Sequence, residues 1–191
     1  APVTIQNRKG ETVFAIDEQP GNAKIDKIPG LRPAFAKDGT ITAANSSSIS
    51  DGAAALVLMR ESNAKAHNCE VLATVLGHAT HSMEPALFTV APVGAMQKLL
   101  SKLGWGVNDV DLWEINEAFA MVTMLAVKEM ALDAAKVNVN GGACALGHPI
   151  GASGARILVT LIHALKARGL KRGIASLCIG GGEAVALAVE V

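Results

Sequence analysis

The sequence lacks three features that would place it in common functional classes: a charge imbalance, paired cysteines and long apolar runs. Its 17 basic and 17 acidic side chains cancel, so the net charge favours neither nucleic acid nor an anionic membrane as a partner. Its 3 cysteines are scattered and form no Cys-x-x-Cys pair, which argues against a disulfide framework and a zinc site. The longest apolar segments, such as residues 118–127, are too short to span a bilayer.

These absences also indicate a compartment. Unpaired cysteines are typical of a reducing environment, and no basic leader followed by an apolar stretch opens the sequence. We therefore expect the cytoplasm, or a mitochondrial or peroxisomal matrix in a eukaryote, with no nucleic-acid or membrane partner and no metal. Any anionic ligand must be held by local groups. Apolar residues make up 50% of the chain, which suffices for a hydrophobic core.

The first 40 residues differ from the rest. Residues 6–39 are rich in Lys, Asp, Gly and Pro and show little periodicity except at 12–16, so we expect loops and turns there. Long structureless stretches are uncommon inside compact domains and are often functional. The pattern predicts a boundary near residue 40 and indicates that the chain begins partway through something larger.

Strand and helix patterns alternate over residues 41–191. The run Ala-Ala-Ala-Leu-Val-Leu-Met at 53–59 suits a strand buried on both faces. Segment 118–130 is apolar nearly all round, so its helix should be buried between layers. This alternation predicts an α/β layered fold with a mixed five-stranded sheet, helices on both faces and a final antiparallel hairpin. Further strands are expected at 71–77, 110–115, 174–179 and 184–189, a brief extended segment at 137–140, and further helices at 61–68, 92–103 and 153–168.

Two polar residues are candidates for a functional site: Asn116 at the expected end of a strand, and His148 in a glycine-rich turn. Asn116 follows the strand at 110–115 and precedes a helix, so it can cap that helix or face a cleft. His148 lies between Gly147 and Pro149. Glycine lets the backbone approach a ligand and proline holds the preceding residue extended, so the imidazole is held in one direction. A structural histidine is the alternative, and the spacing matches neither a P-loop nor a dinucleotide fingerprint.

Cys178 ends a strand and is followed by three glycines. A cysteine in such a place is commonly a small buried hydrophobe, but three glycines cost backbone entropy and bury nothing. Their amides could point at a developing oxyanion, with Gly180 the favoured donor. The thiol could exchange protons if an imidazolium lowered its pKa from the ordinary value of about 8.5. Cys69 and Cys144 are weaker candidates, and we expect His67, His78, His81 and His163 at the surface or in packing.

Four motifs follow one another in the last half of the chain: Asn116-Glu-Ala-Phe119, Asn140-Gly-Gly-Ala143, Gly147-His-Pro-Ile-Gly-Ala-Ser-Gly-Ala-Arg156 and Cys178-Ile-Gly-Gly-Gly182. Each alone is a weak signal. The ordered set, with its spacing, resembles the C-terminal half of a thiolase of the acetyl-CoA acetyltransferase kind. The resemblance covers nearly all of the chain, because it includes Leu31-Arg-Pro-Ala-Phe35, Thr42-Ala-Ala-Asn-Ser-Ser47 and Asp51-Gly-Ala-Ala54.

The resemblance implies separate roles for these residues. In thiolases a cysteine of the N-terminal half carries the acyl group, so His148 would activate that thiol. With a water held by Asn116, His148 would also bind the thioester oxygen as the enolate forms. Cys178 would remove or return the α-proton, and the Gly180 amide would help to form a second oxyanion hole. The implied substrate-binding residues are Ser47, at the pantetheine part of CoA, Phe88, near the acyl pocket where many biosynthetic members look to have methionine, Ala118 and Phe119.

The resemblance also implies what the active protein needs. The substrates would be CoA thioesters, with no separate cofactor, and similar enzymes form dimers and tetramers. Residues 1–40 resemble the end of the loop domain that covers CoA, and residues 41–191 resemble the C-terminal domain. The nucleophilic cysteine is not in this sequence, so the lone chain is expected to be inactive without the N-terminal half. The parent enzyme would interconvert two acetyl-CoA with acetoacetyl-CoA and CoA, or cleave longer 3-ketoacyl-CoA.

Two other functions are compatible with parts of the sequence. A β-ketoacyl synthase-like condensing enzyme would share the Claisen chemistry, but it would use two histidines or a His/Asn pair where this chain has Cys178 and its glycines. A non-catalytic acyl-CoA binding or assembly module fits the missing nucleophile, but it would need neither His148 nor Cys178.

Overall fold

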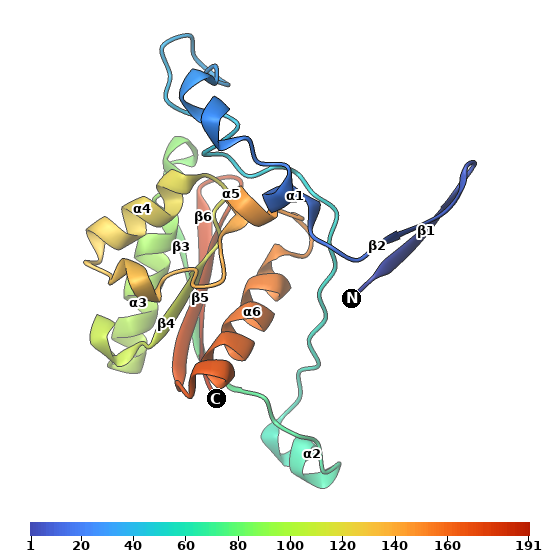
Figure 1. Ribbon diagram of the computed structural model, residues 1–191. Helices are drawn as coiled ribbons and strands as arrows, with labels where there is room; N and C mark the ends of the chain where they lie inside the picture. Colours follow the sequence, from blue (N-terminus) through green and yellow to red (C-terminus); the bar gives the residue numbers. More distant parts are fainter.

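The computed structural model describes residues 1–191 and centres on a mixed four-stranded sheet (Figure 1). The strand order is β3-β6-β5-β4. β4 runs parallel to β5, while β6 is antiparallel to both of its neighbours. The mixed sheet and the final hairpin of β5 and β6 are confirmed. The strands are β3 (Thr74–Ser82), β4 (Leu112–Ile115), β5 (Arg172–Ile179) and β6 (Glu183–Glu190).

The sheet has four strands where five were expected, and the brief extended segment expected at 137–140 pairs with it at one residue only. Of the segment 137–140, Val137 alone makes a bridge, which is parallel to Trp113 of β4. The next residue, Asn138, has a positive φ of 47°, which turns the chain out of an extended path. The outer edge of β4 therefore has one backbone bridge, at Trp113. Beyond it, a side chain and not a strand bonds the backbone of β4.

Helices cover both faces of the sheet, as expected (Figure 1). Helices α3 (Ala91–Leu103) and α4 (Ala120–Glu129) pack on one face, and α6 (Ser153–Arg168) packs on the other. Successive residues of β4 alternate between these layers, as strand geometry requires. Trp113 and Ile115 belong to the core beneath α3 and α4, and Leu112 belongs to the core beneath α6.

The two long amphipathic helices end where the sequence indicates. Pro92 lies in the first turn of α3, and Gly104 ends this helix with a left-handed φ of 66°. Gly169 ends α6 in the same way, with a φ of 63°. Glycine takes this conformation without the steric cost that a Cβ imposes. The stripe of buried residues that holds α6 on the sheet is Ile157, Leu161, Ile162 and Leu165.

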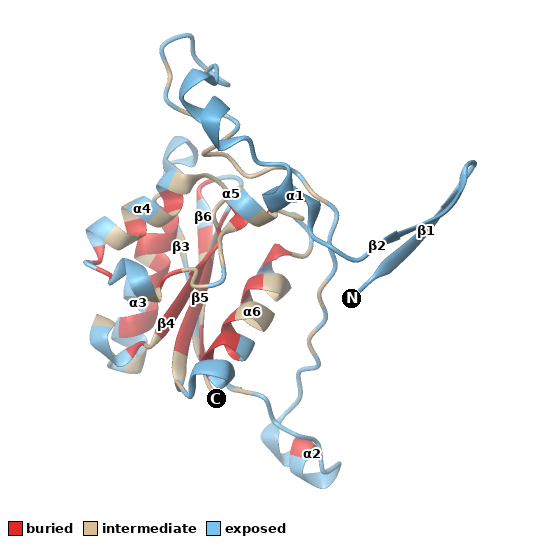
Figure 2. Ribbon diagram, in the orientation of Figure 1, coloured by how far each residue is buried: buried red, intermediate tan, exposed pale blue.

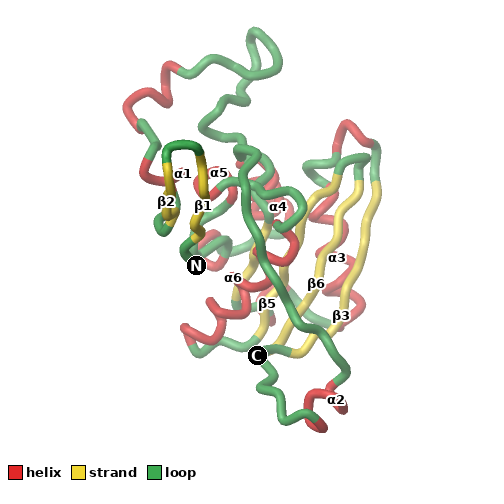
Figure 3. Tube along the Cα trace, turned by 90° about the vertical axis from the view of Figure 1, so that its right-hand side faces the viewer, coloured by secondary structure: helices red, strands yellow, loops and turns green.

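The expectation of a buried strand at 53–59 was wrong. This segment has no strand partner and runs as an exposed extended chain toward α2 (Glu61–Ala66) (Figure 3). Val57 is 87% exposed, and Leu58 and Met59 are also exposed. An apolar run predicts that the residues are buried, but it does not identify the part of the protein, or the partner, that covers them. Nothing within these 191 residues covers this one.

The expectation that the helix at 118–130 is buried between layers was also wrong in part. Of α4, only Val122 and Ala126 are fully buried, whereas Met124 is 68% exposed. The helix has apolar residues on more than one face, but only the face with Val122 and Ala126 meets this sheet. The outer face of α4 is therefore an open apolar surface.

The N-terminal part contains more regular structure than its composition indicates. An antiparallel hairpin of β1 and β2 projects from the body, with Asn7 paired to Gly10 at its turn (Figures 1 and 2). The expected loops and turns lie beyond it, and residues 1–32 are exposed throughout. The elements are β1 (Val3–Asn7), β2 (Gly10–Phe14), α1 (Glu18–Gly21) and a 3-10 helix, η1 (Ile25–Gly30).

The remaining elements are short and join the main layers. The strand expected at 71–77 begins three residues later, as β3. None of the helices combines the length and the apolar character that crossing a membrane requires. The short elements are η2 (Pro85–Leu87), η3 (Val107–Asp109), η4 (Ala134–Lys136) and α5 (Ala143–Leu146).

Candidate active site

The structure brings Asn116 and His148 together. Asn116 directly follows β4, and its Nδ2 lies 3.5 Å from His148 Nε2. The side chain of Asn116 is not a helix cap, because α4 begins only after Phe119. Asn116 is 1% exposed, and its Oδ1 has no hydrogen-bond partner within the protein. A buried amide that is only partly satisfied is typical of a functional position.

Ser153 fixes the orientation of the His148 ring. Its Oγ lies 2.6 Å from His148 Nδ1 and also donates a hydrogen bond to the carbonyl of Pro149, at 3.0 Å. A hydroxyl has one proton to donate, so Ser153 Oγ accepts the second hydrogen bond from Nδ1–H. The imidazole therefore carries its proton on Nδ1 and presents the lone pair of Nε2 toward Asn116.

The surroundings of His148 keep this imidazole neutral. Burial, followed by the positive charge of Arg156, lowers the pKa of His148 from its ordinary value of 6.5. Both causes act against the imidazolium form. At neutral pH the ring is therefore a base with one available lone pair, which is the state that a proton acceptor requires.

Replacing Ser153 with alanine should allow the His148 ring to populate both of its neutral tautomers. The substitution removes a hydrogen bond to Nδ1–H that contributes about 1 kcal/mol, which corresponds to roughly a fivefold change in the tautomer ratio. We expect the ¹⁵N shifts of the imidazole to move from a single Nδ1–H form toward a mixture. Ser101→Ala, at an exposed serine in α3, is the matched control. An unchanged spectrum in Ser153→Ala would show that Ser153 does not set the tautomer.

The loop before α2 holds the backbone of His148. The amide of His148 donates to the carbonyl of Ser48 at 2.8 Å, and Ile49 forms a parallel bridge with His148. Gly147 has a φ of 88°, and a Cβ at this position would collide with the hydroxyl of Ser50. This close approach explains why the residue before His148 is glycine.

A buried ion pair lies behind Asn116 and His148. Glu114, two residues before Asn116 on the same face of β4, is 2% exposed, and its Oε2 lies 3.6 Å from Arg156 Nη1. Burial raises the pKa of Glu114 to about 7, an effect that Arg156 partly offsets. The pair joins β4 to α6, the helix that begins at Ser153. It thus connects the two elements that carry the site.

Cys178 lies near the end of β5 and is 9% exposed. Burial raises the pKa of its thiol, so the lowered pKa considered from the sequence is not the state of this structure. The thiol holds its proton at neutral pH and can donate it. The core cluster that contains Cys178 also packs against Phe88, Ala118 and Phe119, three of the four expected substrate-binding residues.

The three glycines after Cys178 are not equivalent. Gly181 and Gly182 have φ values of 93° and 94°, and a Cβ on Gly182 would collide with the carbonyl oxygen of Met83. Gly180 has neither a positive φ nor a close neighbour. The turn between β5 and β6 therefore requires glycine at positions 181 and 182. It does not require glycine at position 180, where a Cβ would meet no neighbouring atom.

The expected substrate-binding residues form one contiguous group. The amide and the hydroxyl of Ser47 both donate to the carbonyl of Ala118, at 3.0 and 2.8 Å. The ring of Phe119 lies edge-on to Phe88, with centroids 6.3 Å apart, and edge-on to Phe35, at 6.2 Å. All four expected residues are half-buried, so they line a boundary between the core and solvent.

The cysteines and histidines that were ranked lower stay outside this group. Cys69 is exposed, and burial together with the charge of Glu117 raises the pKa of Cys144 to about 12. His67 and His163 are exposed. His81 packs its ring against Gly94 of α3. These positions agree with surface or packing roles.

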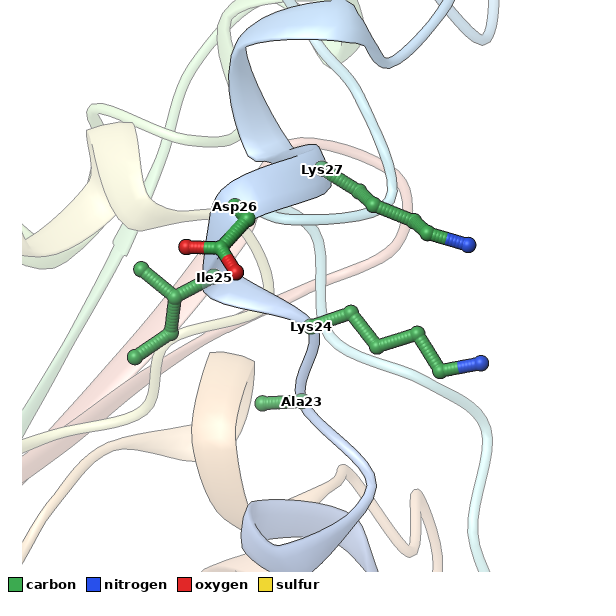
Figure 4. A pocket seen from close by; sticks show the side chains of 5 residues that line it. All are labelled: Ala23, Lys24, Ile25, Asp26 and Lys27. Carbon is green, nitrogen blue, oxygen red and sulfur yellow. The ribbon is translucent and has the colours of Figure 1, made fainter.

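A shallow hollow in the N-terminal part is formed by other residues (Figure 4). It is formed by a single stretch of the N-terminal part, in which Lys24 and Lys27 point to one side and Ile25 to the other. It contains none of the residues described above and has no converging polar groups, so it does not form part of the site. Its lining residues are Ala23, Lys24, Ile25, Asp26 and Lys27.

Several residues of the site escaped the sequence interpretation. Three residues act on partners that lie on another element. Ser153 is hydrogen-bonded to His148 and Asn138 to Ile115, and Glu114 pairs with Arg156. Asn138 binds both backbone groups of Ile115 through its side chain. The available signal was a polar residue, Glu114, inside an otherwise apolar strand, since a buried charge is rarely left without a function or a partner.

The chain matches two family models that together span almost all of it. The model described as the C-terminal domain of thiolase matches residues 69–191, and the model described as the N-terminal domain of thiolase matches residues 1–62. The second match includes the exposed segment 53–59, which finds no partner in this chain.

Proteins similar in sequence include several acetyl-CoA acetyltransferases. The acetyl-CoA acetyltransferase of Escherichia coli K12 is 52% identical over 190 residues, which cover 99% of this chain and 48% of that protein. The acetyl-CoA acetyltransferase of Pseudomonas aeruginosa is 50% identical over 188 residues, covering 97% and 48%. The chain therefore spans about half the length of these relatives.

Solved structures agree with this similarity. The Bacillus anthracis acetyl-CoA acetyltransferase superimposes with a TM-score of 0.95 at 50% identity, and human mitochondrial 3-ketoacyl-CoA thiolase with 0.88 at 36%; each match covers 100% of this chain and 48% of the other. A thiolase from Ascaris suum in complex with coenzyme A gives 0.85 at 42%, covering 98% and 48%. The resemblance carried by the four motifs is confirmed, and the chain belongs to the thiolase family.

Proposed function

We propose that this chain supplies the acid/base and oxyanion part of a thiolase active site, which transfers acyl groups to CoA and makes or breaks the carbon–carbon bond of 3-ketoacyl-CoA. The observation that carries the proposal is the pairing of His148 Nε2 with the Asn116 amide at 3.5 Å, while Ser153 holds Nδ1 on the other side of the ring. Two acetyl-CoA molecules are the simplest substrates for the condensation. The names of the similar acetyltransferases support this choice.

His148 and Asn116 have two successive tasks in this proposal. First, His148 Nε2 accepts the proton of a cysteine thiol supplied by the N-terminal half. The resulting thiolate attacks the acyl carbon of a first acyl-CoA, and CoA is expelled as its thiolate, which takes up a proton from solvent. The protonated His148 then donates a hydrogen bond to the thioester oxygen of the second substrate, together with a water bound by Asn116. Asn116 Oδ1, which is buried and has no protein partner, can accept a hydrogen bond from that water.

Cys178 and Gly180 complete the chemistry from the other side. The protonated thiol of Cys178 suits the thiolysis direction, in which it donates its proton to the α-carbon of the leaving acetyl-CoA enolate. In condensation the thiol first loses its proton to solvent, and the resulting thiolate then removes the α-proton of acetyl-CoA. The Gly180 amide donates to the oxygen of the tetrahedral intermediate on the acyl carbon, and the open space at the Cβ position of this glycine leaves room for a substrate.

The half-buried group of Ser47, Phe88, Ala118 and Phe119 is the proposed binding surface for the substrate. Ser47 and Ala118 face the pantetheine arm, and the edge-to-face rings of Phe88 and Phe119 border the acyl group. The thioester itself supplies the activation, so we propose no additional cofactor or metal. Residues 1–40 belong to the loop region over CoA, and residues 41–191 form the C-terminal domain.

The other half of the enzyme is the main proposed partner. The extended segment 53–59 matches the N-terminal family model and exposes its apolar side chains, so we propose that it pairs with a sheet formed by that half. The nucleophilic cysteine comes from the same half. The assembled enzyme would be a homo-oligomer of the cytoplasm, or of an organelle matrix in a eukaryote, where its thiols stay reduced.

An assay of thiolysis with separated halves tests the proposal. The purified chain alone should cleave no acetoacetyl-CoA, because it lacks the nucleophile. Addition of an N-terminal half from a thiolase should restore cleavage, and a half in which the nucleophilic cysteine is alanine should not. Intact mass identifies the acylated residue. Activity of the lone chain, or acylation of Cys69, Cys144 or Cys178, would contradict the assignment.

A further inference from the structure

Asn138 replaces a strand with its side chain. It follows the single bridge between Val137 and Trp113 and has a φ of 47°. Its Oδ1 accepts the amide proton of Ile115 at 2.8 Å, and its Nδ2 donates to the carbonyl of Ile115 at 2.9 Å. The carboxamide thus offers β4 the same donor and acceptor that a peptide group of a neighbouring strand would offer.

This contact secures the residue that precedes Asn116. On the inner side of β4, the amide of Asn116 donates to the carbonyl of Ser176 in β5 at 2.9 Å. On the outer side, both backbone groups of Ile115 are bonded to Asn138. The chain is therefore held from both sides at the point where it leaves the sheet. A buried backbone group without a partner is costly, so this arrangement leaves the end of β4 one conformation.

We propose that Asn138 is the positioning residue of the Asn116–His148 site, acting through Ile115. Its side chain sets the direction in which Asn116 leaves β4, and so keeps the Asn116 amide against His148 Nε2. The inference rests on the proposed function, in which Asn116 binds the water of the enolate site. Asn138 itself touches no reacting atom.

The placement predicts a selective defect. In the proposed function Asn116 acts when the thioester enolate forms, whereas transfer of an acyl group between CoA and the nucleophilic cysteine uses His148 and the Gly180 amide. Misplacement of Asn116 should therefore impair condensation more than acyl exchange. A general loss of stability would reduce both reactions together, so their ratio separates positioning from a merely structural role.

Two substitutions of Asn138 and one control provide the test in the complete enzyme. Asn138→Asp keeps the preference for the left-handed backbone, but it turns the donor toward Ile115 into an acceptor and adds charge beside Glu117, which lies with Asn138 around Gly142. Asn138→Gly keeps the φ and removes both bonds without adding charge. Asn140→Asp makes the same change at an exposed residue of the same loop, where the side chain contacts only Arg168.

Both Asn138 variants should lower the rate of acetoacetyl-CoA formation about 10- to 100-fold, because small misplacement of a reacting group costs up to about 100-fold. Exchange of labelled CoA into acetyl-CoA should stay within about twofold of the unmodified enzyme, as expected when one step alone is affected. The Ile115 amide should exchange its hydrogen faster in Asn138→Gly. Asn140→Asp should change none of these.

The outcomes are distinguishable. Unchanged condensation in both Asn138 variants, or equal losses of condensation and exchange, would overturn the positioning role. Asn116→Ala serves as the reference and should show the same selective loss. If Asn116→Ala itself retains full condensation, the proposed enolate site fails first, and the role of Asn138 fails with it.

Discussion

The complete enzyme carrying Cys178→Ala should form acyl-enzyme but fail to condense it with a second acetyl-CoA. The thiol is the proposed acid/base at the α-carbon, and a positioned group of this kind contributes about 10²- to 10⁴-fold to the rate. Because the same group acts in both directions, thiolysis should fall by a comparable factor. Intact mass after mixing with acetyl-CoA measures acylation, and acetoacetyl-CoA formation measures condensation.

Cys144→Ala is the matched control for Cys178→Ala. Cys144 is the other cysteine with a raised pKa and partial burial, but its sulfur points to the carbonyl of Glu117 and has no place in the proposed chemistry. We expect the control to retain both half-reactions. Condensation at an unchanged rate in Cys178→Ala would refute the acid/base role. Loss of acylation in that variant would instead assign Cys178 to the first step.

His148→Ala should suppress both half-reactions of the complete enzyme. The imidazole is the proposed base for the nucleophilic thiol and a donor to the enolate oxygen, so we expect a loss of at least about 10³-fold, within the range for positioned acid–base groups. The acylation of the nucleophile, followed by intact mass, measures the first role. His163→Ala, at an exposed position of α6, should be neutral.

The pH dependence of acylation gives a second test of His148. Burial and Arg156 lower the pKa of this imidazole below 6.5, so the ring remains neutral to a more acidic pH than an exposed histidine does. As the pH falls, the acylation rate should therefore hold through 6.5 and decline only below it. A decline centred above that value would show that the neutral His148 is not the base.

The sequence alone was sufficient for the elements whose signals are local. The helix α6 has the expected bounds because its apolar stripe, its glycine stop and its sheet are all within the chain. The hairpin β5–β6 follows from two apolar runs around a glycine turn. The segment 53–59 has the same kind of pattern, but no strand of this chain pairs with it, so the pattern predicted a burial that this chain does not provide.

In the candidate site, too, residues with a local sequence signal could be predicted and residues that act over long distances in sequence could not. Asn116, His148 and Cys178 stand in short motifs beside glycines or at strand ends, and a single pass along the sequence finds them. Ser153 and Asn138 could not be found in this way. Asn138 meets Ile115 across 23 residues, and a bond from a side chain to a distant backbone leaves no periodic trace. The tautomer of His148 depends on Ser153 and therefore needed coordinates.

The open run at 53–59 also bears on the solubility of the chain. A seven-residue stretch with apolar side chains, no proline and no charge can pair with the same stretch of another copy and so template aggregation. Charged residues stand on both sides of the stretch, Asp51 two residues before it and Arg60 and Glu61 directly after it, but none lies within it. The proposed pairing with the other half would cover this stretch, so we expect a higher soluble yield when both halves are made together.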